Sequence, residues 1–195
     1  MFYFPSEYFL QAYSLPLVAE VKFQNDYFSE YPEQIRVGSD RTAVSYTRKS
    51  GYYAIHYNNQ PKTVAPGAIL QLNDGAMSTT GYTYAIFPGE PNQSEQGKLS
   101  PVYTIEPNGS LAVPTGLVFI RFAEGVDVES QREAINRAGY EVVQILDYAP
   151  HAAWLRAQSG NIVDAIAKIP QLEAIPKVEN IEPQMLMERS LRLGR

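Results

Sequence analysis

The stretch Val113-Pro-Thr-Gly-Leu-Val-Phe-Ile-Arg-Phe-Ala-Glu-Gly-Val126 decides the fold, because it opens a series of strand and helix patterns that runs almost to the end of the chain. Residues 117–122 within it are rich in β-branched and aromatic side chains, which predicts a strand. Pro114 and Gly116 precede this run and Gly125 follows it, as turn residues do. The stretch therefore predicts the first strand of a folding unit.

Two helices and three further strands are predicted after this strand. Asp127 suits an N-cap and Gly139 a C-terminal stop, so the residues between them predict a short amphipathic helix. From Asn161 onward, apolar residues recur at helical spacing as far as Pro170, which should end or kink a second helix. Two of the strands are predicted over residues 140–146 and 152–157, and the last lies within residues 178–187, where imperfect alternation leaves its length open.

The order strand, helix, strand, strand, helix, strand is that of a split βαβ sandwich. We therefore expect an α+β protein whose residues 107–195 form a ferredoxin-like βαββαβ sandwich with a C-terminal tail. Residues 1–106 are expected to form a separate, small, mostly β domain. The turn sequence Glu106-Pro-Asn-Gly-Ser110 is the expected boundary between the two domains, because the earlier strand pattern stops there.

The first domain is rich in tyrosine, and its short apolar or aromatic runs alternate with turn sequences. These runs predict strands over residues 17–23, 43–47, 52–57, 69–72, 82–87 and 102–105. The second and third of these strands should pair across Arg48-Lys-Ser-Gly51. Residues 6–14 fit a capped N-terminal helix.

Charge and composition exclude several classes of function. The chain has 16 Lys and Arg against 21 Asp and Glu, and neither predicted domain is basic, so neither a nucleic acid nor a membrane surface is an expected partner. Without cysteine it can form no disulfide and no thiolate metal site. No apolar run approaches the roughly 20 residues of a spanning helix, and the N-terminus lacks the positive start of a secretory signal. Localisation stays open, with the cytoplasm as the default.

Catalytic chemistry has little support in the sequence. The two histidines, His56 and His151, lie in different predicted domains, and no metal-binding or phosphate-binding motif occurs. Glu179 and Glu182 would face opposite sides of a strand, so they do not suggest a catalytic pair. Trp154 is a lone aromatic residue on its strand and is interpreted as a packing residue rather than a base-stacking one. We expect no enzymatic activity, no cofactor and no metal. A cleft that holds a histidine with a perturbed pKa would favour an enzyme instead.

Three stretches carry a resemblance to a known family. They are Val113 to Val126, Tyr148-Ala-Pro-His-Ala-Ala-Trp-Leu-Arg156 and Val178-Glu-Asn-Ile-Glu-Pro183, and together they resemble the prosegment of subtilisin-family serine peptidases. The resemblance spans about residues 102–192. Residues 1–101 resemble, more faintly, the β-rich extension that precedes such prosegments in some bacterial precursors. The Asp, His and Ser motifs of the peptidase itself are absent from the chain.

The resemblance implies a non-catalytic partner of a subtilisin-type serine peptidase, acting in cis or in trans as an inhibitor and a folding chaperone. In this family the sheet of the prosegment docks on two peptidase helices, and the chain after the last strand extends into the substrate groove. Glu182 matches an acidic position that caps a peptidase helix, although Pro183 and Gln184 stand where the family often has further acids. The residues implied to lie in the groove are Met185, Leu186, Met187, Glu188, Arg189, Ser190, Leu191 and Arg192.

A second hypothesis has a different class of partner. The chain could serve as a structural or protein-interaction module that recognises a protein other than a peptidase, with the tyrosine-rich domain as the recognition surface. The sequence does not distinguish a free-standing inhibitor from the front end of a longer precursor.

Overall fold

The computed structural model describes residues 26–38, 43–58, 65–73, 82–92, 97–107 and 109–188. The helix predicted over residues 6–14 and the strand predicted over residues 17–23 lie outside these ranges. Nine strands of the described chain form one sheet, and every strand pair in it is antiparallel.

The strands follow each other in the sheet in the order β3-β4-β2-β5-β6-β8-β7, with β1 paired to β2 and β9 paired to β6. Their bounds are β1 Gln34–Val37, β2 Val44–Tyr57, β3 Leu70–Asn73, β4 Thr83–Pro88, β5 Lys98–Ile105, β6 Leu111–Phe122, β7 Tyr140–Leu146, β8 Ala149–Ala157 and β9 Val178–Met187. The helices are the 3₁₀ turn η2 Val128–Gln131, α1 Arg132–Arg137, α2 Ile162–Ala167 and α3 Ile169–Glu173.

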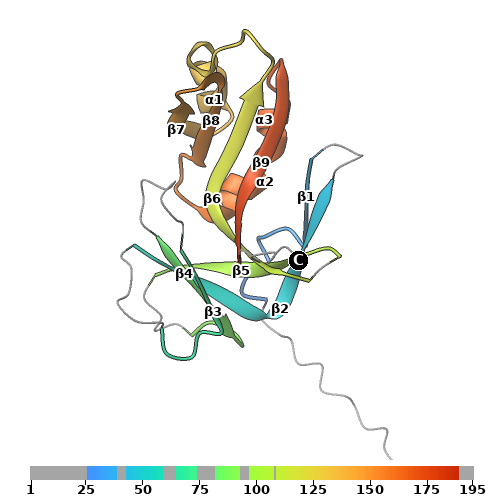
Figure 1. The fold of residues 1–195 in the computed structure, drawn as a ribbon, viewed down its shortest axis with the longest axis vertical. Coiled ribbons are helices and arrows are strands. Elements are labelled where there is room, and N and C mark those ends of the chain that lie inside the picture. Colours follow the sequence, from blue (N-terminus) through green and yellow to red (C-terminus); the bar gives the residue numbers. More distant parts are fainter. Residues whose placement is uncertain are drawn as a thin grey trace, which may run out of the picture.

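The predicted fold class is wrong. The described chain is mostly β, and its strands form one nine-stranded antiparallel sheet rather than a ferredoxin-like α+β sandwich. The cause is the length of β6, which spans 12 residues instead of the six predicted over 117–122. Its beginning pairs with β5, as Ala112 opposite Tyr103, and its later residues pair with β8 and β9. The strand β6 thus joins both parts of the chain in a single sheet (Figure 1).

The predicted domain boundary falls in the turn between β5 and β6, where the amide of Gly109 donates to the carbonyl of Ile105 at 2.8 Å. The division into residues 1–106 and 107–195 stays a prediction. Buried clusters cross this point in the chain, because Ala112 packs with Ile35 and Tyr46 in one of them.

The pairing predicted across Arg48–Gly51 is also wrong. These residues lie inside β2, a strand of 14 residues whose two ends were predicted as separate strands. The ladder between β2 and β5 shifts register between Arg48 and Tyr53, and Gly51 has a φ of +75°. A bulge therefore accommodates the turn-like residues within the strand, and the flanking strands hold its two ends in line.

The predicted helices occur as shorter pieces. Asp127 and Asn161 occupy N-cap positions of η2 and α2, but neither side chain makes a capping hydrogen bond. The second predicted helix ends at Ala167, and α3 begins at Ile169 with Pro170 in its first turn. Proline is compatible with a first turn and not with a helix interior, which explains the break.

The helices lie on one side of β6, β8 and β9 (Figure 1). Between them and the sheet lies a buried, almost entirely apolar cluster, which accounts for the position of each helix. Its members are Val118, Ile120, Phe122, Val128, Ile135, Tyr140, Ala153, Leu155, Ala157, Ala165, Leu172 and Ile175.

Candidate functional site

The opposite side of β6, β8 and β9 has no helix on it among the described residues (Figure 1). Successive side chains of a strand point to opposite faces, so the buried Val118 and Ile120 of β6 place Phe119 on this second side. Residues opposite each other in an antiparallel ladder share a face. We call this surface the open face, and its residues are Leu117, Phe119, Arg121, Ala152, Trp154, Arg156, Asn180 and Glu182.

An aromatic pair lies at the centre of the open face. Phe119 of β6 is directly opposite Trp154 of β8, with ring centroids 5.4 Å apart in an edge-to-face arrangement. Both side chains are partly exposed. The sequence led us to interpret Trp154 as a packing residue, and it does contact Phe119, but the pair also remains accessible from one side. A partly exposed aromatic pair on a sheet surface offers apolar area to a partner.

Charged side chains surround this pair. Arg121 forms an ion pair with Glu179 at 3.7 Å, and Arg156 donates two hydrogen bonds to one carboxylate oxygen of Glu141, at 2.8 and 3.0 Å. All four side chains are about half exposed, so these pairs add little to the stability of the fold. An aromatic centre with a charged rim is the usual anatomy of a protein-binding surface.

Glu182 lies beside the aromatic pair, because it is the β9 residue opposite Phe119. Its carboxylate accepts a hydrogen bond from the side-chain amide of Asn180 at 3.0 Å, and the residue is partly exposed. The amide of Asn180 thus holds the carboxylate in place on the open face. Because the residue is partly exposed, another molecule can reach it.

The other predicted binding residues continue along β9 and beyond it. Met185, Leu186 and Met187 belong to the strand and pair with residues 112–114 of β6. Met185 and Met187 pack against one buried cluster, and Leu186 packs against another. Glu188 follows the strand and is exposed. The remaining predicted residues, Arg189, Ser190, Leu191 and Arg192, lie outside the described part of the chain.

His56 forms the arrangement that most resembles catalytic chemistry. Its Nε2 lies 2.8 Å from the hydroxyl oxygen of Ser100, and burial together with the positive charge of Lys98 lowers its pKa to about 3. Both residues are buried, and Ser100 is not among the residues that line the small cavity beside His56. A base with so low a pKa accepts protons poorly at neutral pH. The pair therefore fits a hydrogen-bonded element of the core better than a nucleophile and its base.

Other catalytic or membrane features are not evident in the described residues. His151 lies in β8, partly exposed and far along the chain from His56. The described part contains no group of three or more histidine and carboxylate side chains that could hold a metal ion. It also contains no helix of the length and apolar character needed to cross a membrane.

Sequence reasoning missed the open face as a surface. Phe119 was recognised only as a strand residue, and its pairing with Trp154 depends on the register between β6 and β8. The two-residue period of a strand was the available signal, because it places Phe119 on the same side as the charged Arg121. Comparison with family models, with curated proteins and with solved structures gives no match for this chain.

Proposed function

We propose that this chain is a non-catalytic domain that binds and inhibits a subtilisin-type serine peptidase and assists its folding, either as the prosegment of a precursor or as a free-standing inhibitor. The proposal starts from the resemblance of three stretches, which include the β6 and β8 sequences and the beginning of β9. Two features of the chain suit such an interaction. The open face could dock on the peptidase, and the chain after β9 could enter its substrate groove.

The observation that supports the proposal most is the open face. It places a partly exposed Phe119–Trp154 pair next to the carboxylate of Glu182, on a side of the sheet that carries no helix in the described chain. Aromatic side chains at the centre of a surface supply much of the binding energy of protein interfaces. A carboxylate beside them can accept hydrogen bonds from the N-terminal amides of a partner helix.

The segment proposed for the substrate groove is shorter than the sequence suggested. Met185 to Met187 would have to leave their ladder with β6 and two apolar clusters to enter a groove. Breaking these contacts costs free energy, so we assign the groove to the chain from Glu188 onward. An extended segment there would bind by backbone hydrogen bonds to a strand edge of the peptidase.

Progress curves of substrate hydrolysis test the proposal. A purified subtilisin is mixed with the full chain and with a version truncated after Glu188, which keeps all of β9. We expect slow-onset inhibition by the full chain with an inhibition constant below about 1 μM. The truncated chain should inhibit at least about tenfold more weakly, because the groove contacts are lost while the open face is kept.

Thermal unfolding of the truncated chain is the control, and its midpoint should match that of the full chain. Absence of inhibition by the full chain at micromolar concentration would argue against a peptidase partner. Equal inhibition by both chains would contradict the assignment of the groove segment and leave the open face as the inhibitory surface.

A further inference from the structure

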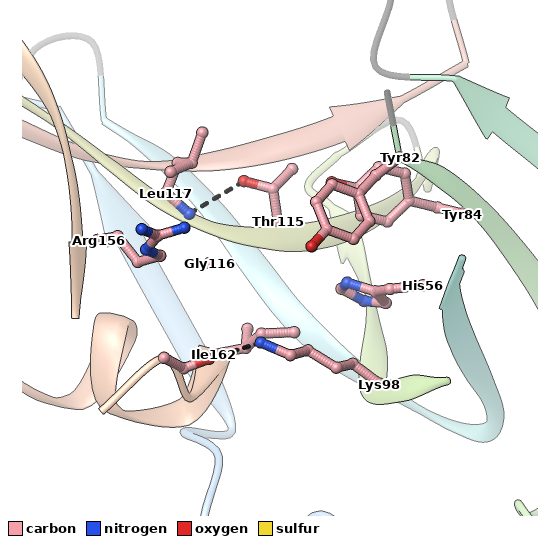
Figure 2. A pocket seen from close by; sticks show the side chains of 10 residues that line it. His56, Tyr82, Tyr84, Lys98, Thr115, Gly116, Leu117, Arg156 and Ile162 are labelled. Carbon is pink, nitrogen blue, oxygen red and sulfur yellow. Dashed lines mark hydrogen bonds between the residues drawn. The ribbon is translucent and has the colours of Figure 1, made fainter. Parts of the chain in front are cut away.

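A small cavity lies where the two parts of the sheet meet, away from the centre of the open face. Its volume is about 60 Å³. Residues of β2, β4 and β5 line one side, and residues of β6, β8 and α2 line the other (Figure 2). The side chains that matter here are those of His56, Tyr84, Lys98, Leu117, Arg156 and Ile162.

Two cations flank the cavity. Lys98 and Arg156 are both exposed residues, and they approach the cavity from different strands, β5 and β8 (Figure 2). The ammonium group of Lys98 donates one hydrogen bond to the carbonyl of Gly160 at 2.9 Å, and Arg156 donates two to Glu141. An ammonium group has three donors and a guanidinium group five, so neither is exhausted. No aspartate or glutamate is among the described residues that line the cavity.

The interior of the cavity is mostly apolar and uncharged. Tyr84, Leu117 and Ile162 provide aromatic and aliphatic walls. His56 is buried and faces Ser100 through its Nε2, so it presents an imidazole ring rather than a cation. The hydroxyl of Thr115 already donates to Gln184 at 2.7 Å and accepts from the amide of Leu117 at 3.1 Å. The positive charge at the cavity therefore comes from Lys98 and Arg156.

We propose that this cavity binds a carboxylate group through Lys98 and Arg156, with a short hydrocarbon stub against Leu117 and Ile162. A carboxylate has two oxygens, which can meet two cations that come from different strands. The cavity volume admits a group of a few heavy atoms and excludes a nucleotide or a sugar phosphate. The carboxylate belongs either to a free small acid or to a peptide, and the site does not depend on the proposed peptidase partner.

Binding is tested by NMR with the full ¹⁵N-labelled chain and sodium acetate, at an ionic strength held constant with sodium chloride. Saturable shifts are expected at the amides of Gly116, Leu117 and Gly160 and at the ring protons of His56. A ligand with so few heavy atoms should bind with a dissociation constant on the order of 1 mM. Shifts that stay linear with acetate, or that chloride reproduces, would overturn the proposal.

Variants identify the cations. Lys98→Met and Arg156→Gln should each weaken acetate binding at least about tenfold, because each removes one of the two charges. Lys49→Met is the matched control, since Lys49 lies over the ring of Tyr52 and does not line the cavity, and it should bind acetate normally. If either Lys98→Met or Arg156→Gln fails to fold, the other variant still tests the proposal. Unchanged affinity in folded Lys98→Met and Arg156→Gln proteins would overturn the assignment.

Two peptides distinguish the source of the carboxylate. Acetyl-Gly-Glu-Gly-amide carries it on a side chain, and acetyl-Gly-Gly carries it at the C-terminus. Tighter binding of one peptide than of acetate identifies a peptide as the natural source, and tighter binding of acetate or propionate identifies a free acid. If none of these ligands causes saturable shifts at the cavity residues, the proposed carboxylate site is wrong.

Discussion

The β1–β5 region and the β6–β9 region belong to one sheet but bury their side chains in different ways. In β6–β9, helices cover one face, and the cluster beneath them is almost entirely apolar. The described residues of β1–β5 include no helix, and tyrosines fill much of the interior there. The buried polar residues of the described chain all belong to the β1–β5 region, and they are His56, Thr83 and Ser100.

The difference follows from what covers the sheet. A layer of helices brings enough aliphatic surface to seal a face, so side chains such as Leu155 need no polar contacts. In the β1–β5 region larger aromatic side chains take part in the interior, and the hydroxyl of Tyr103 donates to the carbonyl of Pro32 at 2.9 Å. The β6–β9 region can therefore leave one face open to a partner, whereas the β1–β5 region carries the buried His56, whose pKa is lowered.

The largest effect should follow from emptying the helix-covered cluster. Leu155 is fully buried, and Leu155→Ala should lower the free energy of unfolding by about 3 kcal/mol. Because β6 joins both regions, we expect both to unfold together. The single tryptophan, in β8, reports on one region, and the tyrosines, most of them earlier in the chain, report on the other. Urea titrations that record tryptophan and tyrosine fluorescence separately measure the unfolding transition of each region.

Coincident tryptophan and tyrosine transitions, both shifted in the variant, would support one cooperative sheet. Two separate transitions, with only the tryptophan transition shifted, would instead support the two predicted domains and break the account of a single folding unit.

The next effect concerns the opposite face of the same strand. Trp154→Ala should weaken peptidase inhibition by about 30-fold, because it removes half of the aromatic pair. Its cost in stability should be only about 1 kcal/mol, since the ring is partly exposed. Inhibition constants and melting temperatures are measured side by side. The control is Tyr148→Ala, which removes an aromatic ring that is 83% exposed beyond the end of β7, and it should inhibit like the unmodified chain.

Acid should affect the β1–β5 region through His56. Burial and the charge of Lys98 lower its pKa from 6.5 to about 3, so the folded chain keeps it neutral while the unfolded chain binds a proton below pH 6.5. Stability is therefore complete above about pH 6.5 and falls as the pH decreases toward 3. Between pH 7 and pH 5 the loss from this group should be about 2 kcal/mol.

Urea titrations at the two pH values measure this loss, with His56→Gln as the reference. The variant lacks the titrating group, so its stability should change less over the same interval. Equal losses in the variant and the unmodified chain would show that His56 is not the source of the acid sensitivity.

The smallest effect is expected for Glu182→Gln. The amide can still contact Asn180, so stability should remain within about 0.5 kcal/mol. Loss of the charge should weaken peptidase inhibition by about fivefold, the size of a favourable interaction with a helix N-terminus. An inhibition constant that rises less steeply with added salt than that of the unmodified chain would support a charge effect. An unchanged constant would remove Glu182 from the interface.

Much of the local structure could be predicted from the sequence, because it depends on nearby residues. The strand over 140–146 was predicted with the bounds of β7. A last strand was predicted within 178–187 without fixed ends, and β9 fills that whole range. The break near Pro170 follows from the ring of proline itself. The continuity of β6 and β2 could not be predicted, since it depends on strands that pair from distant parts of the chain.

The candidate site shows the same limit. Glu182 and the tail were proposed from resemblance, yet the neighbour of Glu182 on the sheet is Phe119, which only the register of β6 and β9 reveals. The cavity beside Lys98 and Arg156 was missed altogether, because these residues are 58 positions apart in the numbering and meet only when β5 and β8 are placed. Side chains that meet across a sheet leave no spacing pattern in the sequence.

The central claim, that the open face binds a subtilisin-type peptidase, is tested most directly at Trp154, the only tryptophan of the chain. The chain is labelled with 5-fluorotryptophan, and its single ¹⁹F resonance is followed as a subtilisin with a blocked active-site serine is added. We predict that the free resonance disappears and a shifted one replaces it, complete at one equivalent. A resonance that stays unchanged at excess peptidase would contradict the claim.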